Sequence, residues 1–245
     1  MAEQNKGMSD LWRRLRFVFM AIVIYRLGTH IPIPGIDPAR LAALFDQNQG
    51  TILEMFNLFS GGALERMSIF ALNVVPYISS AIIMQLFSNS IPYLQELKKD
   101  GQAGRNQITQ FTRYGTVLLA FVQASALAVT LGASGLAYEP GTSFFISAVF
   151  SVVAGTIFLM WLGEQISERG IGNGISIIIA TSILTGIPGA IGQALEQARQ
   201  GDLNILLLLG IGVLAMLVIA IVVFIERGQR RITVNYAQRL SLIHI

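Results

Sequence analysis

The side chains that could support catalysis or bind a metal ion are few in this 245-residue sequence, and they lie far apart. The two histidines, His30 and His244, stand at opposite ends of the chain, so neither a His-x-x-x-His metal pair nor a Ser-His-Asp set can be assembled. Intramembrane aspartyl chemistry needs two carboxylates at membrane depth, and every aspartate falls in a predicted loop or tail. These aspartates are Asp10, Asp37, Asp46, Asp100 and Asp202.

Cysteine is absent, which excludes disulfides, thiolate metal sites, iron–sulfur clusters and cysteine nucleophiles. The stretch Gly170-Ile171-Gly172-Asn173-Gly174 faintly resembles a phosphate-binding loop. It lacks the spacings of such loops and follows a predicted membrane helix where a strand would be required, so we interpret it as a tight turn with positive φ. We therefore expect a protein that is not an enzyme and has no cofactor and no metal.

The composition is that of a membrane protein. Hydrophobic residues make up 53% of the chain and charged residues 13%, about half the charged share of soluble domains. Apolar runs approach the roughly 20 residues that cross a bilayer as a helix. We predict an all-α, multi-pass membrane helical bundle with six spans, and the first apolar run is not a cleavable signal peptide. The predicted spans cover residues 15–31, 67–86, 114–131, 144–162, 175–191 and 203–225.

The basic residues are distributed unevenly between the two sides of this bundle. Four precede or begin the first span, and the loops 88–113 and 163–174 and the C-terminal tail carry most of the rest of the 17 lysines and arginines. The opposite loops hold only Arg40, Arg66 and Arg199. Cytoplasmic loops carry an excess of Lys and Arg, so both termini are predicted to be cytoplasmic.

A short helix hinged by glycines onto a span is the most unusual element. Thr51 and Glu54 have the spacing of a capping box, and the helix over 52–59 covers only ~12 Å. Ser60-Gly61-Gly62 ends this helix before the second span at 67–86. This arrangement predicts a segment that fills a cavity within a membrane protein.

Two local patterns leave alternatives open. Arg26 lies inside the first span, and we interpret it as reaching the membrane interface, with a buried polar contact as the alternative. Asp37-Pro38 predicts a helix start, with Leu41, Leu44 and Phe45 on one face.

Branched aliphatic residues recur four positions apart in two spans, as Val74 and Ile78 and as Ile175 and Ile179. They are ordinary core-facing or lipid-facing positions on this pattern, and a water-excluding hydrophobic constriction is the alternative. A small-solute transporter is a second functional hypothesis. It would place polar groups near the midplane, where this chain offers only mild ones such as Asn73 and Gln123.

Five long stretches resemble the SecY family of protein-translocating channels. They are IPIPGI at 31–36, EMFNLFSGGALERMSIFAL at 54–72, PYIS at 76–79, LMWLGEQISERGIGNGISIII at 159–179 and ERGQRR at 226–231. The resemblance implies the first six helices of a ten-helix fold built from two inverted halves. Residues 1–14 would be a cytoplasmic N-terminus, 15–196 the N-terminal five-helix half, 203–225 the first helix of the second half, and 226–245 a cytoplasmic loop.

The resemblance also implies roles for individual residues. Val74, Ile78, Ile175 and Ile179 would belong to an apolar pore ring, and the second and third spans to one wall of a lateral gate. Arg227, Arg230 and Arg231 would contact a cytoplasmic partner. Residues 52–66 would form a plug that closes the channel. The plug residues are Ile52, Leu53, Met55, Phe56, Phe59, Gly61, Gly62 and Leu64.

The implied function is translocation of unfolded polypeptides across, and insertion of membrane proteins into, the bacterial cytoplasmic membrane. The implied partners are SecE and SecG, the SecA motor or the ribosome, secretory polypeptides with signal sequences, and the lipid bilayer, with no direct binding of nucleic acid. The sequence departs from the family after Arg239, where the tail LSLIHI is apolar. We interpret the chain as a truncated or fragment form, and a short paralogue that dimerises is the alternative.

Overall fold

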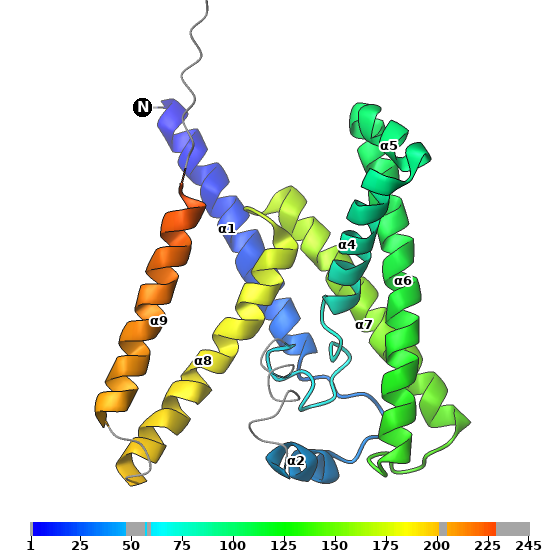
Figure 1. The fold of residues 1–245 in the computed structure, drawn as a ribbon, viewed down its shortest axis with the longest axis vertical. Coiled ribbons are helices and arrows are strands. Elements are labelled where there is room, and N and C mark those ends of the chain that lie inside the picture. Colours follow the sequence, from blue (N-terminus) through cyan, green and yellow to red (C-terminus); the bar gives the residue numbers. More distant parts are fainter. Residues whose placement is uncertain (1, 48–56, 58–59, 201–204, 229–245) are drawn as a thin grey trace, which may run out of the picture. The chain divides into compact units, whose positions relative to one another are not determined.

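The computed structural model describes residues 2–47, 57, 60–200 and 205–228. Within these ranges the chain is helical, apart from turns and two isolated β-bridges, so the predicted all-α class is confirmed (Figure 1). The helices are α1 (Ala2–Gly28), α2 (Pro38–Gln47), α4 (Val75–Ser90), α5 (Pro92–Lys99), α6 (Gly101–Ala133), α7 (Thr142–Arg169), α8 (Gly174–Gln200) and α9 (Ile205–Glu226).

The chain divides into two compact units, residues 1–189 and residues 190–245. In the first unit α6 packs against α4, α5 and α7, and α1 packs against α7. The second unit contains the end of α8 and the whole of α9. The α9 helix is apolar on all sides, with a mean hydropathy of 3.2 in its most apolar window, and that window is not buried.

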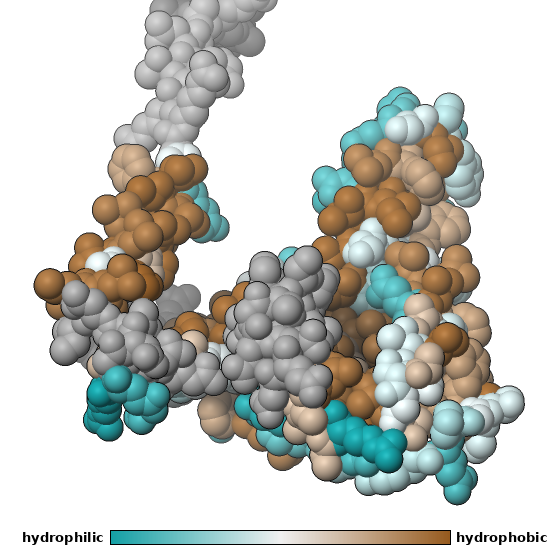
Figure 2. Space-filling model, turned by 60° about the horizontal axis from the view of Figure 1, so that its bottom comes forward, coloured by the Kyte–Doolittle hydropathy of each residue, from teal (hydrophilic) through white to brown (hydrophobic). Residues whose placement is uncertain are grey.

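Four of the described helices are long and apolar enough to cross a membrane: α6, α7, α8 and residues 206–226 of α9. Hydrophobic residues cover much of the surface that is visible in Figure 2. The first two predicted spans correspond to α1 and α4. The α4 helix has 16 residues, and α1 carries Arg13, Arg14 and Arg16 in its middle. The number of six spans therefore stays a prediction.

The expectation of a continuous second span over 67–86 is wrong at its beginning. Residues 61–74 form turns, and regular helix begins only at Val75. Met67 and Asn73 have φ values of 40° and 49°, a left-handed conformation that interrupts an α-helix. This part of the apolar run is buried against neighbouring helices and does not extend the span.

The polar loop predicted over 88–113 is also wrong, because most of it is helical. Pro92 begins α5, and only Asp100 separates α5 from α6, whose first residue, Gly101, is left-handed at φ 66°. Gly104 packs on the backbone of Leu97, so the short helix folds back onto the first turns of α6. The polar residues before Tyr114 thus extend the third helix beyond its apolar part.

The structure shows N-terminal caps at two predicted helix starts, those of α2 and α8. Asp37 Oδ1 accepts hydrogen bonds from the backbone N–H groups of Ala39 (2.9 Å) and Arg40 (3.4 Å), which confirms the cap of α2. Leu41 and Phe45 are buried on one face. Asn173 Oδ1 accepts from Ile175 N (3.0 Å) and Ser176 N (3.2 Å) and so caps α8. Gly172 at φ 71° confirms that Gly170–Gly174 is a tight turn.

The link between α1 and α2 makes backbone hydrogen bonds to two other loops. Ile33 N donates to Met67 O (2.8 Å) and Ile69 N donates to Ile31 O (3.0 Å). A second bridge joins Ile36 to Ala137. These backbone bonds fix residues 67–69 to the end of α1.

Candidate functional site

The two predicted aliphatic pairs meet in one apolar cluster of the first unit. Val74 is 2% exposed and belongs to the buried core of this cluster. Ile78, Ile175 and Ile179 are half-buried and pack against the same core. The structure therefore brings together side chains that are about a hundred positions apart in the sequence. They come from the start of α4 and the start of α8.

The backbone conformations at the start of α4 and at the start of α8 set the directions of these side chains. Asn73, in the left-handed region, reverses the chain immediately before Val74, and Asn tolerates this conformation better than most residues. Val74 is the N-cap of α4, with Pro76 in the first turn, where its missing N–H has no cost. On α8 the Asn173 cap fixes the register that presents Ile175 and Ile179 one turn apart.

Residues 60–74 comprise the end of the predicted plug (60–66) and its link to α4, and we call them the connecting segment. Gly61 and Gly62 have φ values of 66° and 78°, which residues with side chains rarely adopt. A Cβ atom at Gly61 would lie 3.1 Å from Ser182 Cα, so the backbone of the segment lies directly against α8. Ser60 Oγ accepts from Leu64 N (3.1 Å) and closes this turn.

The predicted plug is only partly described. Gly61, Gly62 and Leu64 are seen, and Leu64 is half-buried against the core formed by α2, α6 and α7. The other five lie outside the described residues, together with the Thr51–Glu54 capping box. They are Ile52, Leu53, Met55, Phe56 and Phe59.

Tyr25 and Ser182, two buried polar residues next to the connecting segment, were not anticipated, whereas Asn73 was named as a polar residue within a span. Tyr25 Oη of α1 lies 2.6 Å from Ser182 Oγ of α8, and Asn73 Nδ2 donates to the same oxygen (3.1 Å). Polar residues inside apolar helices are a signal for interhelical hydrogen bonds, and this signal marks Ser182. It does not reveal the partner, because 157 positions separate Tyr25 from Ser182.

Arg26 makes the polar contact that was the alternative interpretation. Its Nη1 donates to Gly61 O at 2.9 Å, and its side chain is half-buried. The guanidinium thus binds a backbone carbonyl of the connecting segment. Because a charge-assisted hydrogen bond is stronger than a neutral one, this is a firm attachment point.

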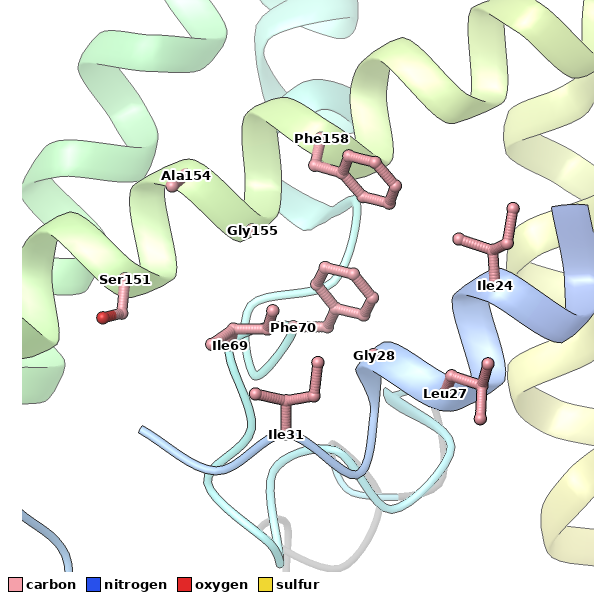
Figure 3. A pocket seen from close by; sticks show the side chains of 10 residues that line it. All are labelled: Ile24, Leu27, Gly28, Ile31, Ile69, Phe70, Ser151, Ala154, Gly155 and Phe158. Carbon is pink, nitrogen blue, oxygen red and sulfur yellow. The ribbon is translucent and has the colours of Figure 1, made fainter. Parts of the chain in front are cut away.

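An apolar groove lies on the other side of the connecting segment. It has a volume of about 520 Å³ and is lined by α1, α7 and residues Ile69 and Phe70 (Figure 3). Phe70 stacks between Tyr25 and Phe158, with ring centroids 6.1 and 5.9 Å apart. Gly28 is in contact with the Phe70 ring, and Gly155 with the Ile69 carbonyl, which leaves no room for a methyl group at either glycine.

The predicted gate helices α4 and α6 are packed closely. Ser80 Oγ donates to Thr112 O (2.8 Å), and Gly115 allows the Ser80 side chain to contact the α6 backbone. Ser80 is buried and Tyr77 is half-buried. Small and hydroxyl-bearing residues let membrane helices approach in this way.

Basic residues gather where the middle of α1 lies near the end of α7. Arg14 Nη1 donates to Gly170 O (3.4 Å), and Arg13 and Arg14 line one cavity with Arg169. Arg14, hydrogen-bonded to Asp10, holds the pKa of that carboxyl below its usual value. Of the predicted partner-binding arginines, Arg227 is exposed, and Arg230 and Arg231 lie outside the described residues.

Comparisons with known proteins agree on one family. A sequence profile of the SecY family matches residues 68–244, which includes most of the tail that we expected to fall outside the family. Protein translocase subunit SecY of Pseudomonas aeruginosa is 61% identical over 238 residues, 97% of this chain and 54% of that protein. The Escherichia coli K12 protein of the same name is 57% identical over 237 residues, 95% of this chain and 54% of that protein.

Solved structures show the same fold at lower sequence identity. Sec61 in the canine ribosome-channel complex from the endoplasmic reticulum has a TM-score of 0.63 at 20% identity, over 91% of this chain and 49% of that chain. A second structure, described as a protein conducting channel, has a TM-score of 0.56 at 20% identity, over 80% and 43%.

The chain spans about half the length of most of the curated relatives that it matches. Its apolar helices and these relatives identify a multi-pass protein of the bacterial inner membrane. Its helical fold and its family profile point the same way, and the chain belongs to the SecY family.

Proposed function

We propose that the chain forms half of a protein-conducting channel, which passes unfolded polypeptides across the cytoplasmic membrane and releases membrane helices into it. The observation that carries the proposal is the convergence of Val74 and Ile78 with Ile175 and Ile179 in one apolar cluster. Family membership supports the same function, because the relatives are named translocase subunits.

The physical requirements of such a channel agree with this cluster. Each residue of a moving polypeptide differs from the last, so fixed hydrogen-bonding partners cannot line the narrowest point. Branched aliphatic side chains exclude water and ions without binding any particular residue. In this proposal the four residues form part of that constriction, and the channel makes and breaks no covalent bonds.

The connecting segment and the helices around it take the remaining roles. Residues 52–66 act as a plug whose attachment to α1 and α8 runs through Ser60 and Gly61. The α4 and α6 helices form one wall of a lateral exit. Their close contact at Ser80 and Gly115 supports a rigid wall that moves as a unit.

The partners follow from the family and from the charge distribution. SecE and SecG are membrane partners, and SecA or the ribosome binds at the cytoplasmic side through Arg227, Arg230 and Arg231. Both termini of the chain face the cytoplasm, because the basic residues concentrate on that side. Secretory polypeptides with signal sequences are the substrates.

A chimaera tests the function. The segment of this chain that aligns with Pseudomonas aeruginosa SecY replaces its counterpart in that protein, in cells whose own SecY is depleted. We expect growth and export of secreted proteins to be maintained. Failure of export, with the chimaera present in the membrane and bound to its partner subunits, contradicts the proposal.

Saturable uptake of a small solute by vesicles that contain the chimaera tests the transporter alternative. Uptake that is lost on changing Gln123 or Asn73 would favour a transporter over a protein-conducting channel.

A further inference from the structure

Tyr25 and Ser182 form a buried hydroxyl pair within the apolar cluster. Their side chains are 1% and 0% exposed, and their oxygens are 2.6 Å apart. Burying hydroxyl groups is costly unless their hydrogen bonds are satisfied. Apolar residues of similar size would fill the same space without needing hydrogen bonds. The groups that the two hydroxyls bind therefore indicate what the pair does.

The pair lies against the first residues of the connecting segment. Tyr25 Oη donates to Ser60 O at 3.3 Å, and Arg26 Nη1 donates to Gly61 O at 2.9 Å. Gly61 also lies against the backbone of Ser182. Two successive carbonyl groups are therefore held from α1, while α8 supports them from the other side.

The hydroxyl protons have two complete arrangements. A hydroxyl donates one proton and accepts two. In the first arrangement Ser182 donates to Tyr25, and Tyr25 donates to the Ser60 carbonyl. In the second, Tyr25 donates to Ser182, and Ser182 donates to Ile178 O of its own helix at 2.9 Å. The second arrangement leaves each hydroxyl with an acceptor after Ser60 has been released.

Both arrangements keep the bond from Asn73 Nδ2 to Ser182 Oγ. Ser60 O also has a second donor, Ala63 N at 3.4 Å, within its own turn. Release of Ser60 therefore leaves neither the Tyr25 nor the Ser182 hydroxyl without an acceptor. The bond from Asn73 to Ser182 remains, and it fixes the position of the neighbouring Val74. An attachment with these properties can open and close repeatedly.

We propose that Tyr25, Arg26 and Ser182 form a latch that holds the Ser60 and Gly61 carbonyls in the closed channel. The latch opens when the Tyr25 O–H bond rotates from Ser60 to Ser182 and the half-buried Arg26 guanidinium exchanges the Gly61 carbonyl for water. This inference rests on the proposed function and identifies the positioning residues that regulate the plug. Tyr25 and Arg26 act on the connecting segment through its backbone carbonyl groups, and Ser182 acts through Tyr25.

Tyr25→Phe and Ser182→Ala test the latch in the chimaera, reconstituted with the partner subunits of Pseudomonas aeruginosa. Tyr25→Phe keeps the ring that stacks on Phe70 and removes only the hydroxyl. Loss of one hydrogen bond shifts an equilibrium about 2- to 12-fold. We expect Tyr25→Phe to raise resting ion leak, and export of a precursor with a defective signal sequence, within that range. Ser182→Ala removes the acceptor of the second arrangement and leaves Tyr25 bonded to Ser60, so it should not raise the leak. Export of the normal precursor should be maintained.

Matched variants separate the latch from general effects. Tyr138→Phe removes an exposed hydroxyl, and Thr181→Ala removes one that bonds only its own helix, at Ile177 O. Both should leave the resting leak unchanged. Leak of Tyr25→Phe no greater than that of Tyr138→Phe overturns the latch while leaving the proposed function intact. The proposed function fails only if the unmodified chimaera does not translocate.

An engineered disulfide between the connecting segment and α8 can substitute for the latch. It tests whether the extra leak comes from release of the segment and not from general destabilisation of the protein. A Cβ at Gly61 would lie 3.2 Å from Thr185 Oγ1, so Gly61→Cys with Thr185→Cys places two sulfurs within bonding reach in a chain that has no other cysteine. In the Tyr25→Phe background, oxidation should abolish the extra leak and a reductant should restore it. Leak that persists once the disulfide has formed overturns the proposal, and Gly61→Cys alone controls for the strain of a side chain at this left-handed position.

Discussion

Arg113 of α6 and Glu164 of α7 form a charged hydrogen bond, with Nε 2.8 Å from Oε1. The Arg113 side chain is 37% exposed and that of Glu164 is 20% exposed. The pair joins a predicted gate helix to the helix behind it, close to the end of α7 that leads into α8. The pair therefore links α6 to the last part of α7, which leads into the turn before Ile175.

Removing one partner of this pair should destabilise the protein. Arg113→Ala leaves the Glu164 carboxylate largely buried without its charged donor. A hydrogen bond to a charged group contributes about 1.5–3 kcal/mol, and partial exposure reduces this to about 1–2 kcal/mol. The midpoint of denaturation in detergent should fall accordingly. Arg105→Ala, which removes the same charge at an exposed site, is the control. An equal fall in both variants would contradict the argument.

Polar substitution in the apolar cluster should loosen the proposed constriction. Ile78→Asn or Ile175→Asn in the chimaera introduces an amide that binds water where branched side chains now exclude it. We expect higher ion leak and export of precursors with defective signal sequences. Ile78→Leu, with a similar volume, should behave almost as the unmodified chimaera. Unaltered leak and selectivity in both Asn variants would rule out the ring assignment.

The contact between Gly28 and Phe70 should not tolerate a methyl group. Gly28→Ala forces the Phe70 ring away from its place between Tyr25 and Phe158, and overpacking of this kind costs about 1–3 kcal/mol. Gly132→Ala provides the matched comparison, since no atom lies within 4 Å of its added Cβ. That variant should be neutral or up to about 1 kcal/mol more stable. Thermal unfolding followed by tryptophan fluorescence measures both, and the prediction fails if the two variants unfold at the same temperature.

The cap of α2 should be removable without affecting the rest of the fold. Asp37→Ala deletes the acceptor for Ala39 N and Arg40 N, at a cost of about 1 kcal/mol. Asp37→Asn keeps a capping oxygen and should retain most of the stability. Hydrogen exchange of residues 38–47 reports the change locally. Exchange that is equally fast in both variants would show that the ion pair between Arg40 and Asp37 matters more than the cap.

Sequence patterns predicted the features that depend on neighbouring residues. The Asp37-Pro38 cap, the Gly172 turn and the apolar face of α2 each lie within a few positions and follow from short-range geometry. The polar stretch 92–113 was misjudged for a related reason. Hydropathy distinguishes residues that lie in lipid from residues that lie in water. A helix such as α6 continues from the lipid into the water, so hydropathy alone does not separate its polar end from a loop.

The connecting segment could not be predicted in detail because its geometry depends on distant residues. Nothing near Met67 or Asn73 in the sequence indicates left-handed backbone, which tertiary contacts impose there. The pattern around Val74 and Ile175 allowed core-facing or lipid-facing positions or a constriction. The structure places both residues in one apolar cluster, and the constriction stays a proposal. Nothing near Tyr25 or Ser182 in the sequence indicates that they meet, because each lies in an apolar run beside another polar residue, Arg26 or Thr181.

The backbone bonds of residues 67–69 to the end of α1 divide the connecting segment mechanically. Residues 60–66 form an arm that pivots on the pinned residues, and residues 70–74 form a second arm that cannot follow, because Ile33 and Ile31 hold its base. We infer that force on the first arm reaches these bonds before it reaches Val74. In the proposed channel, displacement of the plug and widening of the constriction would then be separate mechanical events.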